Sequence, residues 1–170
     1  MRSFFVLLLV AMSLLAAGEQ SGRRAPGFSL PDSSGKQYDL AEYRGKLVVV
    51  DFMQVACPHC KVFSAILESA KAKYGDKIVV LSIVNPPSDQ KSVAQYIAEN
   101  KVKLPILFDC GQVAYSYLRP SGASITIPHV FLIDGEGMIR NDFNFNDKTT
   151  SIFEGKGLYT EIDRLLAAKK

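Results

Sequence analysis

The sequence contains no tryptophan, and its 170 residues include only two histidines and three cysteines. These residues form no second C-x-x-C pair and no pair of histidines at helical spacing, so a structural zinc or copper centre is a minor alternative. The chain also lacks an excess of charge, with 20 lysines and arginines against 17 aspartates and glutamates. Such a balance indicates neither nucleic acid nor an anionic membrane surface as a partner.

The first eighteen residues have the pattern of a secretory signal peptide. Arg2 precedes an apolar run at residues 4–15, in which Ser13 is the one polar residue, and small residues follow at 16–18. A retained anchor would need about 20 apolar residues, but polar residues begin at Glu19. We therefore expect cleavage after Gly18 and an exported protein, periplasmic or secreted, that contacts a membrane only if the segment stays uncleaved.

The rest of the chain has the size of one domain. We expect residues 19–26 to form an N-terminal linker and residues 27–170 to form a single globular domain. A chain of this length buries roughly two-thirds of its unfolded surface in one core, so no second domain is needed.

Hydrophobic periodicity predicts alternating strands and helices in the first half of this domain. Residues 47–52 and 78–84 are continuous apolar runs, which are typical of strands buried on both faces. Between them, apolar residues of 61–74 recur at spacings of three and four and predict a helix that ends at Gly75. A shorter helical face follows at residues 92–100.

The second half predicts a hairpin and a last helix. After a short strand at 106–108 and a loop, strands at 130–133 and 138–143 are separated by Asp-Gly-Glu-Gly at 134–137, a hairpin signal. A helix at 159–168 closes the chain. A parallel β-α-β unit followed by an antiparallel hairpin predicts an α/β fold with a mixed central sheet flanked by helices on both faces.

The motif that carries chemistry is Cys57-Pro58-His59-Cys60, between the first buried strand and its helix. A helix N-terminus favours a negative charge, so Cys57 is placed to form a thiolate, the species that attacks disulfides. We expect Cys57 to be exposed and Cys60 to lie deeper. A purely structural disulfide is less plausible, because so short a loop constrains the unfolded chain weakly.

Motifs along most of the chain resemble the thioredoxin superfamily, in particular its exported TlpA-like and redoxin (AhpC/TSA-like) branch. The matching segments are Ala-Pro-Gly-Phe-Ser-Leu-Pro-Asp at 25–32, Arg-Gly-Lys at 44–46 with the strand that follows, the C-x-x-C pair, and Ile-Pro-His-Val-Phe-Leu-Ile-Asp-Gly at 127–135. The resemblance implies the thioredoxin fold and thiol–disulfide exchange, with no cofactor.

The resemblance also implies roles for four residues. Cys57 corresponds to the attacking thiol and Cys60 to the resolving thiol. Pro128 corresponds to a cis proline beside them, and Asp51 to a buried acid that helps to deprotonate the second cysteine. We expect the pKa of the Asp51 carboxyl to be raised by burial. The alternatives are a trans proline that begins a strand and a paired structural carboxylate.

Two departures from the family pattern concern the surroundings of the sulfurs. Ala56 stands where the family usually has tryptophan, and His129 follows the proline where threonine is common, so His129 either brings a second imidazole near the sulfurs or is a partly buried strand residue. The tetrad itself is similar to that of DsbA-like oxidants. His59, next to Pro58, could stabilise the Cys57 thiolate and make the pair more oxidising than that of a thioredoxin.

Three other functions stay open. A peroxiredoxin-like peroxidase needs a threonine three residues before its reactive cysteine, where this chain has Gln54. A copper- or zinc-binding carrier would use the cysteines and a histidine without turnover. A thioredoxin-like binding module would have an idle redox pair. The leading hypothesis is exchange with exported protein thiols and disulfides, with an unidentified redox partner protein that recycles the pair.

Cys110 is the odd cysteine. It follows the predicted strand at 106–108, and cysteine is among the most buried residue types. We therefore expect its thiol to be buried.

Overall fold

A computed structural model describes residues 18–120 and 125–168. The predicted signal segment lies outside the described residues, apart from Gly18. No helix in the two described ranges has the length and apolar character needed to cross a membrane.

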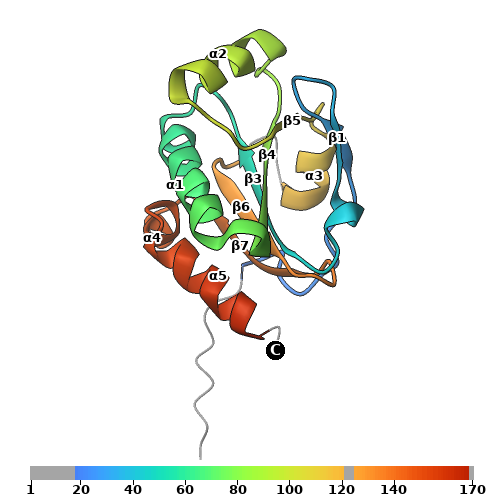
Figure 1. The fold of residues 1–170 in the computed structure, drawn as a ribbon, viewed down its shortest axis with the longest axis vertical. Coiled ribbons are helices and arrows are strands. Elements are labelled where there is room, and N and C mark those ends of the chain that lie inside the picture. The colour runs from blue at the N-terminus through green and yellow to red at the C-terminus, as the bar shows by residue number, and fades with distance from the viewer. Residues whose placement is uncertain (1–17, 121–124, 169–170) are drawn as a thin grey trace, which may run out of the picture.

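The centre of the fold is a five-stranded mixed sheet in the order β5-β4-β3-β6-β7 (Figure 1). Its strands are β3 (Leu47–Met53), β4 (Ile78–Val84), β5 (Ile106–Phe108), β6 (His129–Ile133) and β7 (Ile139–Asn144). The first three are parallel to one another, whereas β6 is antiparallel to both β3 and β7. Every strand predicted from the sequence is thereby confirmed, including the final hairpin.

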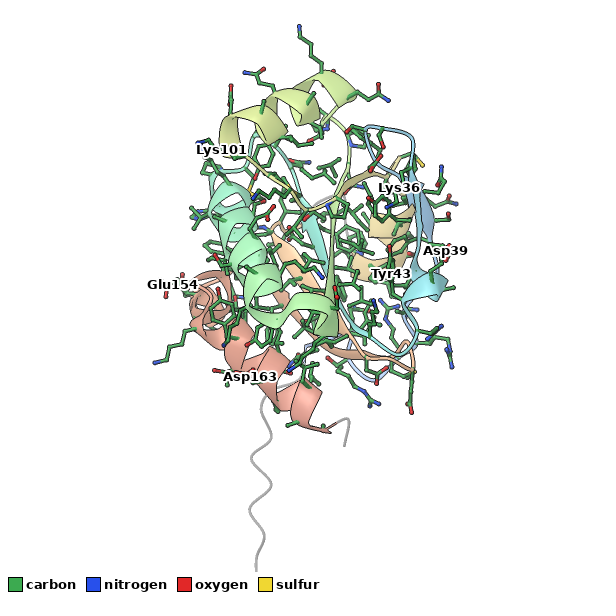
Figure 2. All side chains as sticks on the ribbon, viewed as in Figure 1. Lys36, Asp39, Tyr43, Lys101, Glu154 and Asp163 are labelled. Carbon is green, nitrogen blue, oxygen red and sulfur yellow. A yellow bond between two sulfur atoms is a disulfide. The ribbon has the colours of Figure 1, made fainter. Side chains whose placement is uncertain are left out.

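Both faces of this sheet are covered, as predicted. One face packs against α1 (Pro58–Tyr74), α4 (Thr150–Phe153) and α5 (Lys156–Ala168). The other packs against α3 (Gln112–Leu118), the hairpin of β1 (Ser29–Pro31) and β2 (Gln37–Asp39), and a 3-10 helix (Leu40–Tyr43). Charged side chains in or directly after the helices, such as Lys101, Glu154 and Asp163, are exposed (Figure 2).

Alternation along β3 divides the core between these two faces. All seven residues of β3 are buried, and successive side chains of a strand point to opposite faces. Val48, Val50 and Phe52 pack on the α3 side, and Val49 packs on the α1 side. Asp51 has the same parity as Val49 and therefore faces α1.

Helix α1 begins at the redox motif and ends where the sequence predicted. Cys57 is its N-cap and Pro58 its first residue, a position at which proline is well suited because its missing N–H needs no partner. Phe63, Leu67 and Ala70 form the buried face. Gly75, with φ of 55°, ends the helix and begins a 3-10 turn (Gly75–Lys77) that leads into β4.

Helix α2 (Gln90–Asn100) lies at the carboxyl end of the parallel strands (Figure 1). Its buried Val93 and Tyr96 join Met53, Val84 and Cys60 in a third cluster of the core. This packing places α2 beside the redox motif.

The N-terminal segment predicted as a linker runs along the edge of β7. Gly22 donates its N–H to the carbonyl of Ile139 (2.8 Å), and Ile139 donates to the carbonyl of Arg23 (2.9 Å). Ala25 is buried. Backbone pairing with an edge strand explains why this segment is ordered. The polar composition of the segment does not reveal that pairing.

Candidate active site

The two cysteines of the motif form a disulfide across the first turn of α1. Their Cα atoms are 5.2 Å apart. Cys57 is half-buried, and its Sγ accepts the N–H of Cys60 at 3.2 Å, whereas Cys60 is fully buried. The expected order of exposure is confirmed: only Cys57 presents its sulfur toward solvent at the helix N-terminus, where backbone N–H groups favour a thiolate.

Asp51 lies at the same end of β3 and has no exposed surface. Neither of its carboxylate oxygens has a hydrogen-bond partner among the described residues. Burial without a partner penalises the charged form and raises the pKa of this carboxyl from 3.8 to about 8. The side chain is therefore protonated in most molecules at neutral pH, and it is ionised in a minority of them.

Pro128 directly precedes β6, the first strand of the hairpin. The Ile127-Pro128 peptide bond is cis. Register brings the following residue, His129, beside Phe52 of β3, so the proline adjoins the end of the strand that leads into the motif. The carbonyl of Pro128 accepts the N–H of Phe145 at 3.1 Å.

His59 is exposed on the first turn of α1, two residues after Cys57. Its ring stacks on Phe145, with ring centroids 4.2 Å apart and an angle of 27° between the planes. Phe145 comes from the loop after β7 and was not identified as a site residue from the sequence.

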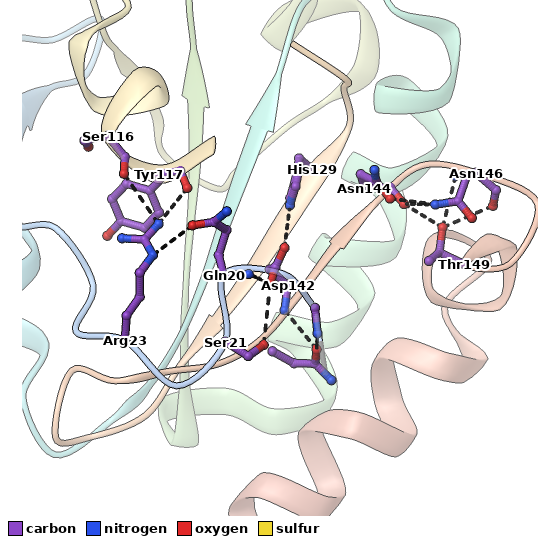
Figure 3. Close-up of polar contacts among 12 residues, drawn as sticks. Gln20, Ser21, Arg23, Ser116, Tyr117, His129, Asp142, Asn144, Asn146 and Thr149 are labelled. Atoms are coloured by element: carbon purple, nitrogen blue, oxygen red, sulfur yellow. Dashed lines mark hydrogen bonds and ion pairs between the residues drawn. The ribbon is translucent and has the colours of Figure 1, made fainter. Parts of the chain in front are cut away.

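His129 is turned toward the N-terminal segment. Its Nε2 lies 3.1 Å from Oδ2 of Asp142, and its ring stacks on Phe131 at 4.7 Å. Asp142 also accepts the N–H of Gln20 at 2.9 Å (Figure 3). The geometry is that of a partly buried strand residue, one of the two alternatives for His129, whose ring contacts Asp142 and Phe131.

The prediction that Cys110 is buried is wrong, because this cysteine is free and exposed. Its neighbour Asp109 takes the inward position instead. The Asp109 carboxylate accepts the N–H groups of Val113 (3.1 Å) and Ala114 (2.9 Å) at the start of α3. Since the carboxylate must turn in to reach these donors, the next side chain turns out.

We therefore expect a maleimide to label Cys110 rapidly in the oxidised native protein, with one label per chain. The Cys110→Ala variant should take up none, because the other two cysteines are held in the disulfide. Mass spectrometry of the intact protein measures the label. Slow labelling that speeds up only on unfolding would contradict the exposed position.

A surface hollow of about 740 Å³ lies away from this chemistry. It is lined in part by Leu47, Asp134 and Leu165. Leu47 is the first residue of β3, whereas the redox motif follows the last. The hollow is therefore at the opposite end of the sheet from Cys57.

Comparison with known proteins gives consistent matches. The model of the AhpC/TSA family matches residues 21–142. The thioredoxin-like protein YneN of Bacillus subtilis is 26% identical over 126 residues, covering 73% of this chain and 71% of that protein. The thiol-disulfide oxidoreductase ResA of Bacillus thuringiensis is 26% identical over 119 residues, covering 69% of this chain and 66% of that protein.

Solved structures share the fold. A secreted disulfide oxidoreductase of Mycobacterium tuberculosis is 20% identical with a TM-score of 0.64, covering 79% of this chain and 95% of that one. An exposed lipoprotein thioredoxin, Etrx1 of Streptococcus pneumoniae, is 22% identical with a TM-score of 0.68, covering 82% of this chain and all of that one (100%). These likenesses confirm the predicted thioredoxin fold.

Proposed function

Because the chain belongs to the AhpC/TSA family of thioredoxin-superfamily redoxins, we propose that it is a thiol–disulfide oxidoreductase whose redox pair is Cys57 and Cys60. The observation that carries the proposal is the C-x-x-C disulfide at the N-terminus of α1, with one sulfur half-buried and the other fully buried. The relatives named thiol-disulfide oxidoreductase support the same activity.

Exchange proceeds in two substitutions at sulfur. In the reducing direction, the Cys57 thiolate attacks a client disulfide, forms a mixed disulfide and displaces a client thiolate. Cys60 then loses its proton and attacks Cys57 Sγ, which closes the internal disulfide and releases the second client thiolate. The two electrons pass from the protein dithiol to the client, and the two thiolates take up the two protons. In the oxidising direction the same steps run in reverse.

The substrates are protein thiols and disulfides, and we propose that the clients are exported. The secreted enzyme of M. tuberculosis and the exposed lipoprotein of S. pneumoniae support this compartment, as does the signal pattern of residues 1–18. A second redox protein must recycle the pair, because each turnover leaves it in the opposite oxidation state.

Of the three other functions, the peroxidase and the metal carrier have less support. Gln54 stands where a peroxidase needs threonine, and its Nε2 lies 3.4 Å from the carbonyl of Pro86. Within residues 18–120 and 125–168, no three histidine, cysteine, aspartate or glutamate side chains gather into a possible metal site. Neither observation favours a second candidate function.

The test is a stoichiometric exchange between the oxidised protein and a reduced dithiol peptide. We expect one client disulfide to form and two protein thiols to appear per chain, as counted by thiol labelling and mass spectrometry. With hydrogen peroxide as the only oxidant, the reduced protein should not sustain turnover in the presence of a dithiol. Peroxide consumption as fast as peptide oxidation would support the peroxidase and contradict the proposal.

A further inference from the structure

An aromatic cluster links the redox motif to the loop after β7. The His59 ring stacks on Phe145 at 4.2 Å, and Phe145 meets Phe153 of α4 edge-on at 5.4 Å. Phe153 in turn contacts Phe63 of α1 at 4.8 Å. Because residues four apart share one helix face, His59 and Phe63 lie on the side of α1 that meets the two phenylalanines, and the contacts run in a chain from His59 to Phe63.

The loop that carries Phe145 is held by its own hydrogen bonds (Figure 3). The Thr149 hydroxyl donates to the carbonyl of Asn144 at 2.6 Å, and the Asn146 side chain donates to Oδ1 of Asn144 at 2.6 Å. The Phe145 N–H donates to the carbonyl of Pro128 at 3.1 Å. The backbone of Phe145 is thus fixed by contacts that do not depend on His59, and its ring also packs against Phe153.

We propose that Phe145 is a positioning residue for the redox pair, which acts by holding the His59 imidazole over its ring at the N-terminus of α1. The inference deepens the proposed function, because it concerns the poise of the same cysteines. Phe145 lies 86 positions after His59 in the chain. By this inference it helps to set how strongly the disulfide oxidises its clients.

The physical basis is the electron distribution of the phenyl ring. Its face is negative and its edge positive, so an imidazole stacked on it at 4.2 Å is held in place by ring–ring attraction. The His59 imidazole lies on the first turn, two residues after Cys57, and the partial positive charge of its N–H group favours a negative charge on the neighbouring Cys57. Stabilising the thiolate stabilises the reduced form, which makes the disulfide a stronger oxidant.

Stacking also restricts the imidazole. His59 is exposed, and an exposed side chain otherwise samples several rotamers. The Phe145 face confines the ring to one orientation, so its effect on the Cys57 sulfur is not averaged over positions that point to solvent. Loss of the ring should weaken the effect of His59 even though His59 itself remains.

The experiment measures the equilibrium of the Cys57–Cys60 pair against glutathione buffers in the full-length protein. In Phe145→Leu, which keeps apolar volume but removes the ring, we expect the equilibrium constant for reduction to fall about threefold to tenfold. A tenfold change corresponds to about 30 mV in a two-electron couple. Phe145→Tyr, which keeps the ring, should restore the wild-type value.

Two further variants separate positioning from loss of stability. Phe28→Leu removes a buried ring from the opposite face of the sheet and should leave the potential unchanged. In the His59→Pro background, Phe145→Leu should have no further effect, because the imidazole on which it acts is gone. An unchanged potential in Phe145→Leu, or an equal shift with and without His59, would overturn the inference.

This measurement does not depend on a client. If the protein failed to oxidise dithiol peptides while Phe145→Leu still shifted its potential, the proposed function would fail and the positioning role would stand. If exchange occurred and the potential did not move, only the positioning role would fail.

Discussion

Cys57→Ser is expected to abolish disulfide exchange in both directions. The serine hydroxyl forms no mixed disulfide, and Cys60, which is fully buried, cannot meet a client in place of Cys57. Rates measured by quenched labelling of a reduced dithiol peptide should fall to those of the peptide with buffer alone. The fold should persist, because the substituted side chain belongs to the half-buried N-cap and serine is itself a favoured N-cap residue.

Cys60→Ser is expected to behave differently. Cys57 still attacks, but no second thiol releases the product, so mixed disulfides with clients should accumulate and appear as reducible adducts of higher mass. Cys110→Ser is the matched control, because it removes the exposed third thiol while leaving the pair intact. Adducts that formed through Cys60 in the Cys57→Ser variant, and none in Cys60→Ser, would reverse the two roles.

The regular part of the fold could be predicted because its elements carry a strong periodic signal. The buried strands β3 and β4 are continuous apolar runs, and α1 has a clear apolar face. The short elements β1, β2 and α4 were not predicted, since segments of three or four residues are too short for periodicity to register. Helix α3 was predicted as a loop because its capping comes from a carboxylate outside the helix, Asp109.

The candidate site likewise contains some features that the sequence predicts and others that it does not. The position of the cysteines at a helix start and the burial of Asp51 follow from local sequence, because the motif and the acid adjoin one apolar run. The partners of the two histidines could not be predicted. Phe145 reaches His59 and Asp142 reaches His129 only through strand pairing and loop packing, and no spacing in the sequence encodes those contacts.

Burial of Asp51 carries an energetic cost that depends on pH. With a folded pKa of about 8 against 3.8 for the free side chain, the folded state disfavours the charged form. A raised carboxyl pKa does not lower the free energy of unfolding at a pH below the pKa of the unfolded state. The loss of stability grows as the pH rises from 3.8 to about 8. At pH 7 it amounts to about 4 kcal/mol.

Asp51→Asn should therefore have two effects of opposite sign. The amide has no charge to desolvate, so the free energy of unfolding should rise relative to the wild type at neutral and alkaline pH, and the difference should vanish below about pH 4. Chemical denaturation at several pH values measures it. The release step should slow by about tenfold to a hundredfold at neutral pH, because the amide cannot accept the Cys60 proton.

The pH dependence of release distinguishes a proton acceptor from a packing residue. In the wild type, the single-turnover rate at which Cys60 resolves a mixed disulfide should rise with pH and level off near 8, as Asp51 ionises. In Asp51→Asn this inflection should disappear, whereas attack by Cys57 should keep its rate. Asp109→Asn, which alters a buried carboxylate at the start of α3, should keep the inflection. Unchanged rates for both half-reactions in Asp51→Asn would reduce Asp51 to a structural residue, and the stability gain alone would remain to be measured.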